Sequence, residues 1–433
     1  MTPTIQPLRA GLIGAGMIFA ETYRPFFEGV GHSALVANGQ LVDVRLAGVA
    51  TRSGGRAAAY ETQAPPRTAG FRSFSGPDCV EQLLATPLDA VCVATPDDRH
   101  FPAALASLRS GRHVLIEKPA VLTLGERGQL LDAARRAGVL VKVVYHKLAD
   151  PDHKKLRTHV ADGTLRHVNS GYCSLLEPRS VSRDQFAEWV VGRNPATYVG
   201  VHYLKLIDFT FGSDWRLVRV SASGQRGIVG PADGPTFDSV LTQVVYAYPD
   251  GREAAFDLHT GWVGPDNSPG YVEQEVQFRF DNGLWNAHQR KRGVELCVEG
   301  RTPHELKETP NHHYNGTFLE PWGERSQRGY GVEVIRRFFE EVAHVEFGGP
   351  AGERPQRLAA MSALTYNDLG ADRNVVAAVQ AVEAILAEQA AGKPGCVAFV
   401  DHPLGEIVLL RPGDPEPRVL HPTPGPAGGE ARQ

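Results

Sequence analysis

A glycine-rich segment near the start of the chain has the composition of a phosphate-binding turn. It reads G-A-G-M-I-F from Gly14 to Phe19 and follows a short apolar run. Gly14 permits a tight turn, Gly16 lets the backbone approach a pyrophosphate, and a helix that starts near Met17 and Ile18 offers oriented N–H groups. Phe19 stands where a small residue is usual. We favour a dinucleotide-binding turn, with a purely structural turn as the alternative.

The end of the next predicted strand bears on which dinucleotide is bound. A carboxylate at this place accepts the ribose hydroxyls of NAD and repels a 2′-phosphate. This chain has Thr51 and Arg52 there instead. A hydroxyl and a guanidinium suit a 2′-phosphate, because Arg forms charge-assisted hydrogen bonds to it. The sequence therefore predicts NADP, with NAD still open; the alternative is that Arg52 stacks on adenine or faces solvent.

Two later segments have a specific pattern. The letters A-T-P-D-D-R-H run from Ala94 to His100, and G-R-H-V-L-I-E-K-P run from Gly111 to Pro119. Together with the glycine turn, their order and spacing resemble the Gfo/Idh/MocA family, the group of glucose-fructose oxidoreductase and inositol dehydrogenase. The resemblance covers residues 1–150 well and the remainder more loosely. It implies a Rossmann domain, a second α/β domain with a large open sheet often used for oligomerisation, and hydride exchange with sugars, cyclitols or related polyols.

The resemblance assigns roles to residues of these segments. Lys118 falls on the family's active-site lysine, and Glu117 and Pro119 frame it beside the nicotinamide. A lysine cation at a strand end can also stabilise a developing alkoxide in a desolvated site. The alternative is a surface lysine. The resemblance places the cofactor-lining loop at Thr95, Pro96 and His100.

A helix in the second domain supplies the family's other catalytic group. The family pattern is D-x-G-x-H-x-x-D, and this chain reads Y-V-G-V-H-Y-L-K from Tyr198 to Lys205. The i, i+4, i+7 spacing predicts Tyr198, His202 and Lys205 on one helix face. His202 matches the family histidine, and an imidazole can accept a hydroxyl proton near neutral pH. Tyr198 and Lys205 replace the two aspartates of the family pattern. Tyr198 either contacts substrate, relays a proton or only shapes the pocket. For His202, the alternative is a structural histidine.

Further substrate contacts are predicted from aromatic and polar segments. His146 and Lys147 end the last Rossmann strand, where the family often contributes a polar contact. Two segments predicted as loops, His259 to Trp262 and Asn311 to Asn315, combine aromatic rings with hydrogen-bonding groups, which suits a carbohydrate. The residues that we select from them are Trp262 and His313. Neighbouring His312 and His313 point apart, so we expect no metal site.

The elements that must position these residues follow from periodicity. Residues 1–148 alternate β-rich runs with helical patterns, which predicts a Rossmann domain. Residues 149–411 predict an α/β domain with a large open, mainly antiparallel sheet, including hairpins at Asp250-Gly251 and Asn282-Gly283 with type I′ turns. Residues 412–433 are rich in Pro and Gly and are expected to form a loose tail. The fold class is α/β.

Composition excludes several classes of protein. The 433 residues carry a net charge of −4, so no global field attracts nucleic acid. The basic run Arg290-Lys291-Arg292 is predicted to be a solvated turn, and the five cysteines are odd in number and lack a C-x-x-C pair, which predicts free thiols. No apolar stretch approaches the length of a bilayer span. We therefore expect a cytoplasmic protein without a membrane or nucleic-acid partner, and the resemblance adds a homo-oligomer, a dimer or tetramer.

These observations lead to one functional prediction and two alternatives. The prediction is an NADP- or NAD-dependent oxidoreductase that acts on a secondary alcohol of a sugar, sugar derivative or cyclitol. Lys118 polarises the oxygen and His202 handles the proton. The first alternative is a glycosidase that oxidises its sugar transiently and retains its cofactor. The second is a non-catalytic nucleotide-binding regulator, prompted by Tyr198 and Lys205 in place of aspartates.

Overall fold

The computed structural model describes residues 5–185, 187, 189–212, 215–266, 272–288 and 313–422. The chain divides into two compact units. The first unit comprises Met1–Leu122, Glu126–Lys154 and Asn311–Asp372. The second unit comprises Thr123–Gly125, Lys155–Pro310 and Arg373–Gln433. Each unit is described by itself.

The first unit contains a seven-stranded sheet in the order β2-β3-β1-β5-β6-β7, with β4 paired to β3. All pairs are parallel except the hairpin of β2 and β3. The Rossmann strands predicted from alternating patterns are thereby confirmed. The strands are β1 (Ile5–Ile13), β2 (Ala34–Ala37), β3 (Gln40–Thr51), β4 (Arg72–Ser75), β5 (Ala90–Val93), β6 (His113–Ile116) and β7 (Val141–Val143).

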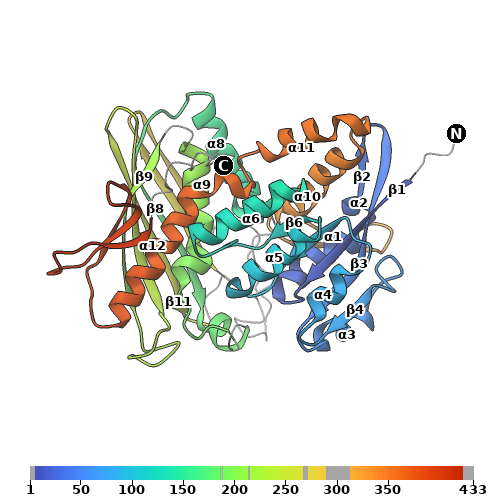
Figure 1. Ribbon diagram of the computed structural model, residues 1–433, viewed down its shortest axis with the longest axis horizontal. Helices are drawn as coiled ribbons and strands as arrows, with labels where there is room; N and C mark the ends of the chain where they lie inside the picture. Colours follow the sequence, from blue (N-terminus) through green and yellow to red (C-terminus); the bar gives the residue numbers. More distant parts are fainter. Residues whose placement is uncertain are drawn as a thin grey trace, which may run out of the picture. The chain divides into compact units, whose positions relative to one another are not determined.

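Helices connect these strands and cover the sheet (Figure 1). Strands β5 and β6 are buried at every position, as expected for continuous apolar runs with both faces covered. The helices are α1 (Arg24–Glu28), α2 (Val30–Ser33), α3 (Gly55–Glu61), α4 (Cys79–Leu84), α5 (His100–Arg109), α6 (Leu124–Ala137), α7 (His146–Ala149) and α8 (Pro151–Ala161), with a π-helix η1 (Phe19–Tyr23) and a 3₁₀ turn η2 (Asp97–Arg99).

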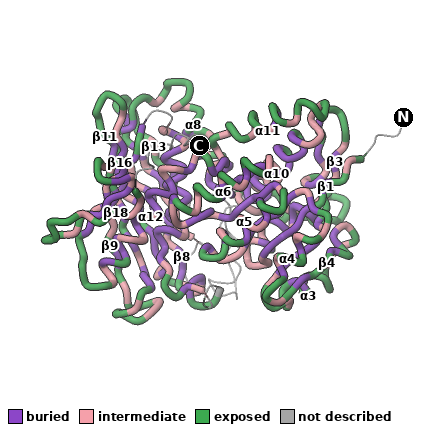
Figure 2. Tube along the Cα trace, viewed as in Figure 1, coloured by how far each residue is buried: buried purple, intermediate pink, exposed green. Residues whose placement is uncertain are grey.

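A later segment of the chain joins the first unit, whereas the sequence placed it in the second domain. The helix α10 (Tyr330–Phe347) packs beside β2 and α1, and Figure 1 shows it in orange next to the blue strands. Phe339 stacks on Phe26 with ring centroids 5.0 Å apart. The amphipathic face of α10 thus completes the core on one side of the Rossmann sheet. Also in this segment are β14 (Gly316–Leu319), β15 (Arg325–Arg328), η6 (Ala351–Glu353), α11 (Arg354–Ser362) and η7 (Leu369–Ala371), and α11 exposes most of its residues (Figure 2).

The second unit is built on a nine-stranded sheet in the order β13-β12-β8-β11-β10-β9-β16-β17-β18. Only β8 and β11 pair in parallel, so the predicted mainly antiparallel sheet is confirmed. The strands are β8 (Val168–Pro178), β9 (Arg216–Gln225), β10 (Ser239–Ala247), β11 (Glu253–Gly264), β12 (Glu273–Phe280), β13 (Gly283–His288), β16 (Val397–His402), β17 (Gly405–Leu410) and β18 (Arg418–His421).

Two long helices cover the sheet of the second unit. The helix α12 (Arg373–Ala390) contacts β9, β16 and β17, and it also packs against α9 (Val201–Phe211). Along β10 the buried Val240, Thr242 and Val244 alternate with more exposed residues, which is the pattern of a sheet covered on one face. The unit also contains the π-helices η3 (Val181–Gln185) and η4 (Ala196–Gly200).

Two local predictions need correction. Both predicted hairpins form, but Phe280 pairs with Gly283, so the second turn lies at Asp281-Asn282 rather than one residue later. Among the four residues of the two predicted turn dipeptides, only Gly251 has a positive φ, so neither turn is of type I′, which needs two such residues. In the segment expected to be loose, residues 418–421 form the strand β18, which extends the sheet by pairing with β17.

The structure describes four of the five cysteines and the helices that bear on a membrane span. The described cysteines, Cys79, Cys92, Cys173 and Cys396, are buried free thiols, whereas Cys297 and the basic run at 290–292 lie outside the described residues. Of the helices that the structure describes, none is both long and apolar enough to cross a bilayer.

Candidate active site

The carboxyl ends of three adjacent strands bring the predicted first-unit residues to one edge of the sheet. Ile13 of β1 pairs with Val93 of β5, which pairs with Ile116 of β6. The segments that follow these strands begin at Gly14, Ala94 and Glu117. In an open α/β sheet this edge is where ligands bind. We call these three segments the strand-end cluster.

The glycine turn of the strand-end cluster requires glycine at its first position. Gly14 has a φ of +96°, and a Cβ added there would lie 2.3 Å from the carbonyl oxygen of Ala94. At Gly16 the nearest atom to an added Cβ is Nη1 of Arg56, at 3.6 Å, so the protein itself leaves room for a side chain. Gly14 therefore serves the fold, while the open space beside Gly16 fits a ligand group such as a pyrophosphate.

The bulky side chain of Phe19, which follows the glycine turn, lies in the interior of the first unit. The chain is helical from Met17 and passes into the π-helix η1 at Phe19. The buried ring of Phe19 packs edge-on against Tyr60, with centroids 5.0 Å apart. Met17 and Ile18 stay half-buried at the turn. Phe19 thus lies in the core cluster of the first unit, together with residues of the sheet.

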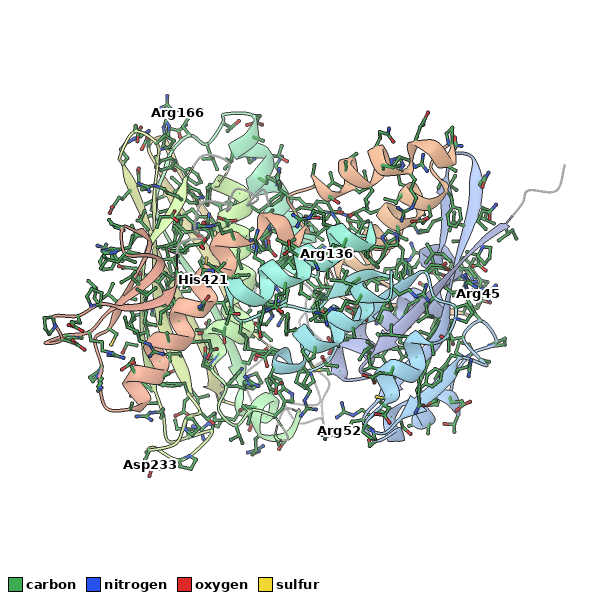
Figure 3. The ribbon with its side chains drawn as sticks, viewed as in Figure 1. Arg45, Arg52, Arg136, Arg166, Asp233 and His421 are labelled. Atoms are coloured by element: carbon green, nitrogen blue, oxygen red, sulfur yellow. The ribbon has the colours of Figure 1, made fainter. Side chains whose placement is uncertain are left out.

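Basic side chains gather at the end of β3. Thr51 accepts a hydrogen bond from the backbone N–H of Gly54 through its hydroxyl oxygen at 3.1 Å. Arg52 is exposed, and Figure 3 shows it at the surface of the first unit. Arg56, at the start of α3, lies between this strand end and Gly16. Sequence reasoning missed Arg56, although a cation four residues beyond Arg52 in the next helix was a usable signal.

His100 joins two segments of the strand-end cluster. Its Nδ1 lies 2.7 Å from the carbonyl oxygen of Pro119, and its Nε2 lies 2.7 Å from that of Thr95. Burial lowers the pKa of His100, so the neutral ring can donate only one of these hydrogen bonds. His100 was predicted to line the cofactor; its buried ring instead holds the Thr95 turn against Pro119. Thr95 Oγ1 is buried and has no hydrogen-bond partner among the described residues, which fits an acceptor or donor from a bound cofactor.

Lys118 lies beside a buried polar group of the first unit. Lys118 is half-buried at the end of β6, and the preceding Glu117 is 6% exposed. Oε1 of Glu117 accepts a hydrogen bond from the hydroxyl of Tyr23 at 3.0 Å, and His146 Nε2 lies 3.9 Å from the same oxygen. His146 also meets Tyr314 edge-on, with centroids 5.5 Å apart. Neither Tyr23 nor Tyr314 could be linked to Glu117 by sequence reasoning, because they lie far from it along the chain.

The predicted residues of α7 are more enclosed than a substrate-contact role suggests. His146 and Lys147 are both buried. Burial, with the charges of Lys118 and Lys147, lowers the pKa of His146 to about 3, so its ring is neutral at physiological pH. A neutral imidazole beside Lys118 can hydrogen-bond but does not add a second cation.

The predicted helix of the second unit contains a junction that the sequence did not show. Tyr198 lies in the π-helix η4, whereas His202 and Lys205 lie in α9. A π turn holds more residues than an α turn, so the i, i+4, i+7 spacing of an α-helix does not apply across the junction. The spacing therefore does not place Tyr198 on the same helix face as Lys205. His202 is 9% exposed, and Lys205 is 1% exposed.

Aromatic packing defines the surroundings of Tyr198. Its ring lies 4.9 Å from Trp189 and 6.0 Å from Trp262, measured between centroids. Trp262 is 0% exposed, and its Nε1 donates to Glu177 at 2.9 Å. Trp262 was predicted to touch substrate from a loop, but residues 259–262 belong to strand β11. Alternation along the strand buries Thr260 and Trp262 and exposes His259.

The remaining predicted loop is only partly described. His313 is exposed and belongs to the first unit, while Asn311 and His312 lie outside the described residues. In the described ranges, no group of three or more His, Cys, Asp or Glu side chains could hold a metal ion.

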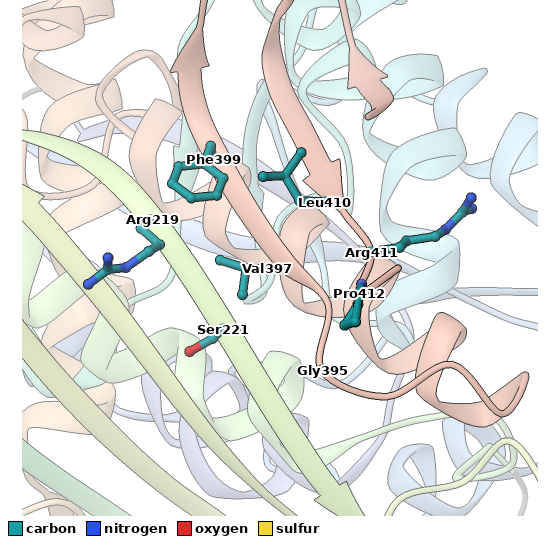
Figure 4. A pocket seen from close by; sticks show the side chains of 8 residues that line it. All are labelled: Arg219, Ser221, Gly395, Val397, Phe399, Leu410, Arg411 and Pro412. Atoms are coloured by element: carbon teal, nitrogen blue, oxygen red, sulfur yellow. The ribbon is translucent and has the colours of Figure 1, made fainter. Parts of the chain in front are cut away.

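A surface hollow of about 510 Å³ in the second unit involves none of the predicted site residues (Figure 4). It lies over β9, β16 and β17, and Val397 and Phe399 contribute apolar surface to it. Its lining residues are Arg219, Ser221, Gly395, Val397, Phe399, Leu410, Arg411 and Pro412.

Comparison with known proteins bears on the strand-end cluster. Residues 8–145 match the model of an oxidoreductase family with an NAD-binding Rossmann fold, and this range contains the glycine turn, Thr95 and Lys118. Residues 8–145 thus have the NAD-binding Rossmann domain of the Gfo/Idh/MocA oxidoreductase family. The resemblance inferred from the motifs is thus confirmed.

Two relatives of known name illustrate the similarity. The chain is 32% identical over 123 residues to 1,5-anhydro-D-fructose reductase from Ensifer adhaerens, which covers 27% of this chain and 37% of that protein. It is 27% identical over 216 residues to D-glucoside 3-dehydrogenase from Escherichia coli (strain K12), which covers 48% of this chain and 55% of that protein. The matches therefore span about a third to a half of these relatives.

A solved structure shows the same fold across both units. GenD2 from gentamicin A biosynthesis, determined in complex with NAD, superposes with a TM-score of 0.60 at 19% identity. The superposition covers 93% of this chain and 100% of that chain. At this level of identity the likeness concerns the fold alone.

Proposed function

We propose that the chain is an NAD(P)-dependent oxidoreductase that transfers a hydride between the nicotinamide and a secondary alcohol or ketone of a sugar, sugar derivative or cyclitol. The observation that carries this proposal is the strand-end cluster. The glycine turn follows β1, and Lys118 comes after β6, which is separated from β1 in the sheet by β5 alone. The named activities of the two relatives, a sugar reductase and a glucoside dehydrogenase, support the class of substrate.

Residues of the first unit fit a dinucleotide. Backbone N–H groups near Gly16 would hold the pyrophosphate, and the buried hydroxyl of Thr95 would meet a polar group of the cofactor. Thr51, Arg52 and Arg56 offer a hydroxyl and two cations near the end of β3, which favours the 2′-phosphate of NADP. The nicotinamide, when bound, supplies or accepts the hydride.

The chain's own residues handle the charge and the proton. Lys118 stabilises the negative charge that develops on the substrate oxygen. His202 accepts the hydroxyl proton during oxidation, a role that comes from the family pattern. Since Lys118 belongs to the first unit and His202 to the second, each assignment is tested separately.

A cofactor-absorbance screen tests the proposal. Wild-type protein is assayed with NAD and NADP against sugars, glycosides, cyclitols and their ketones, in both directions. We expect reduction or oxidation of the cofactor with at least one of these compounds. Calorimetry of cofactor binding is run in parallel. Cofactor binding by folded protein without turnover of any compound would contradict the enzymatic assignment and favour a regulator.

A further inference from the structure

A buried carboxyl group directly precedes the proposed active-site lysine. Glu117 directly follows β6, and its backbone N–H donates to the carbonyl oxygen of Val93 at 2.9 Å. Its side chain accepts the hydrogen bond from Tyr23, whose ring is 0% exposed. Tyr23 ends η1, the helical turn that follows the glycine segment. This single hydrogen bond therefore ties the helix after the glycine turn to the residue before Lys118.

Several titratable groups surround the Glu117 carboxyl group. Tyr23 donates to it, and His146 lies 3.9 Å away. The charge of Lys118 favours its ionised form, and its own charge disfavours ionisation of the Cys92 thiol. Tyr314 interacts in the same way with Tyr23 and packs against His146. The cluster thus collects groups from η1, β5, β6, α7 and the segment before β14.

Of Glu117, Tyr23, Cys92 and His146, only Glu117 changes charge near neutral pH. Burial raises the pKa of Glu117 to about 7, against the opposing effects of Lys118 and of the Tyr23 hydrogen bond. Burial also raises the pKa values of Tyr23 and Cys92 far above neutrality, so both stay protonated. Burial lowers the pKa of His146 to about 3, so its ring stays uncharged. The negative charge beside Lys118 therefore depends on the ionisation of Glu117.

We propose that Glu117, anchored by Tyr23, is a positioning residue that holds Lys118 through its negative charge, so that turnover requires an ionised Glu117. This inference rests on the proposed oxidoreductase function. The carboxylate acts in a desolvated place, where a neighbouring charge is screened less than in water. Loss of that charge on protonation removes its attraction for the ammonium group of Lys118, and catalysis declines with falling pH.

The first experiment follows kcat against pH in wild type, Tyr23→Phe and Glu117→Gln. A hydrogen bond donated to a carboxylate favours its charged form, so its removal in Tyr23→Phe makes Glu117 harder to ionise. The acid limb of the profile is expected to move upward by about one pH unit, the order for a hydrogen bond to a charged group. In Glu117→Gln the contribution of Glu117 to this limb disappears, and kcat stays at a low value because position 117 has no charge left to titrate.

A matched control separates positioning from general destabilisation. Tyr60 also donates to a carboxylate, Glu28, at 3.0 Å within the first unit. Tyr60→Phe loses the same kind of hydrogen bond away from Lys118, and it should change the unfolding midpoint without moving the acid limb. An acid limb that stays in place in both Tyr23→Phe and Glu117→Gln, with folded proteins, would overturn the proposal.

A second measurement does not depend on turnover. Reductive methylation with ¹³C-formaldehyde places a reporter on lysine amines, and Lys118→Arg identifies the Lys118 resonance. We expect this resonance to shift in a step near pH 7 that moves upward in Tyr23→Phe and is lost in Glu117→Gln. Absence of the step in wild type overturns the link between Glu117 and Lys118. An intact step in a protein that turns over no sugar or polyol refutes the proposed function but supports the link.

Discussion

The strand-end cluster and the helix α9 differ in how their polar residues are positioned. In the strand-end cluster, separate strands end side by side, and hydrogen bonds between distant parts of the chain hold their residues. Examples are His100 to Pro119 and Tyr23 to Glu117. In α9, His202 and Lys205 belong to one continuous helix, and the preceding Tyr198 is placed by two tryptophans.

This difference affects how well each region keeps its geometry when a residue changes. A strand end is fixed by ladder hydrogen bonds on both sides, so removal of one side chain leaves the backbone in place. Aromatic packing around Tyr198 depends on shape, so a change there is transmitted to neighbouring rings. Substitutions in the strand-end cluster should therefore report on chemistry, whereas those near Tyr198 report on chemistry and packing together.

Lys118→Met should have the largest effect. Removal of the cation is expected to lower kcat/KM by more than about a hundredfold while cofactor affinity stays nearly unchanged, because the loss affects charge that develops only in the transition state. Steady-state kinetics and calorimetric cofactor titration measure the two quantities. Lys154→Met, which removes a partly exposed lysine paired with Glu333, is the control. Near-normal turnover by folded Lys118→Met would refute the catalytic assignment.

His202→Ala tests the other region. If His202 is the general base, the variant should lose about a hundredfold in kcat at neutral pH. It should also lose the contribution of the imidazole to the acid limb of the oxidation profile, while the contribution of Glu117 remains. The profile is compared with that of Glu117→Gln, which removes a different titrating group. An unchanged pH dependence in His202→Ala would show that another group accepts the proton, with Tyr198 as the first candidate.

The sequence allowed the strand-end cluster to be predicted because its motifs follow strands at fixed spacing. Gly14, Thr95 and Lys118 each come directly after an apolar run, and adjacent parallel strands bring such positions together. The partners Tyr23 and Arg56 were not predicted. Their contacts depend on where η1 and α3 pack, and no local pattern encodes that.

In the second unit, periodicity predicted the sheet but not the surroundings of the site residues. The alternation of residues 253–264 is that of a strand, yet the segment from His259 to Trp262 was interpreted as a loop because of its glycine and polar residues. The π-helix η4 was also missed, since the sequence of a π turn differs little from that of an α-helix. The place of helix α10 in the first unit depends on the stacking of Phe339 on Phe26, a contact between distant residues that no local pattern predicts.

The double substitution Thr51→Asp with Arg52→Ala tests the cofactor side of the strand-end cluster. The exchange removes a charge-assisted pair with a 2′-phosphate and adds a like-charge clash, each worth about 1 to 3 kcal/mol. Wild type should prefer NADP, and the double variant should prefer NAD, as measured by titration of both cofactors. Arg56→Ala serves as a comparison, because Arg56 lies nearer Gly16. A wild type that binds NAD more tightly would show that Arg52 points away from the adenosine.

The smallest expected effects come from two alanine substitutions in the glycine turn, which compare the structural Gly14 with the functional Gly16. Gly14→Ala places a Cβ against the Ala94 carbonyl oxygen and forces a non-glycine residue to a φ of +96°, so it should lower the free energy of unfolding by about 1 to 3 kcal/mol. Gly16→Ala meets only the side chain of Arg56 at 3.6 Å, so its unfolding midpoint should equal that of wild type. The added methyl group instead occupies space meant for the pyrophosphate, and cofactor affinity should fall by about tenfold, equivalent to about 1.4 kcal/mol. Denaturant unfolding and calorimetry on the same two proteins provide the comparison. Full cofactor affinity in Gly16→Ala would mean that the pyrophosphate does not approach this turn, and the strand-end cluster would then need a different ligand.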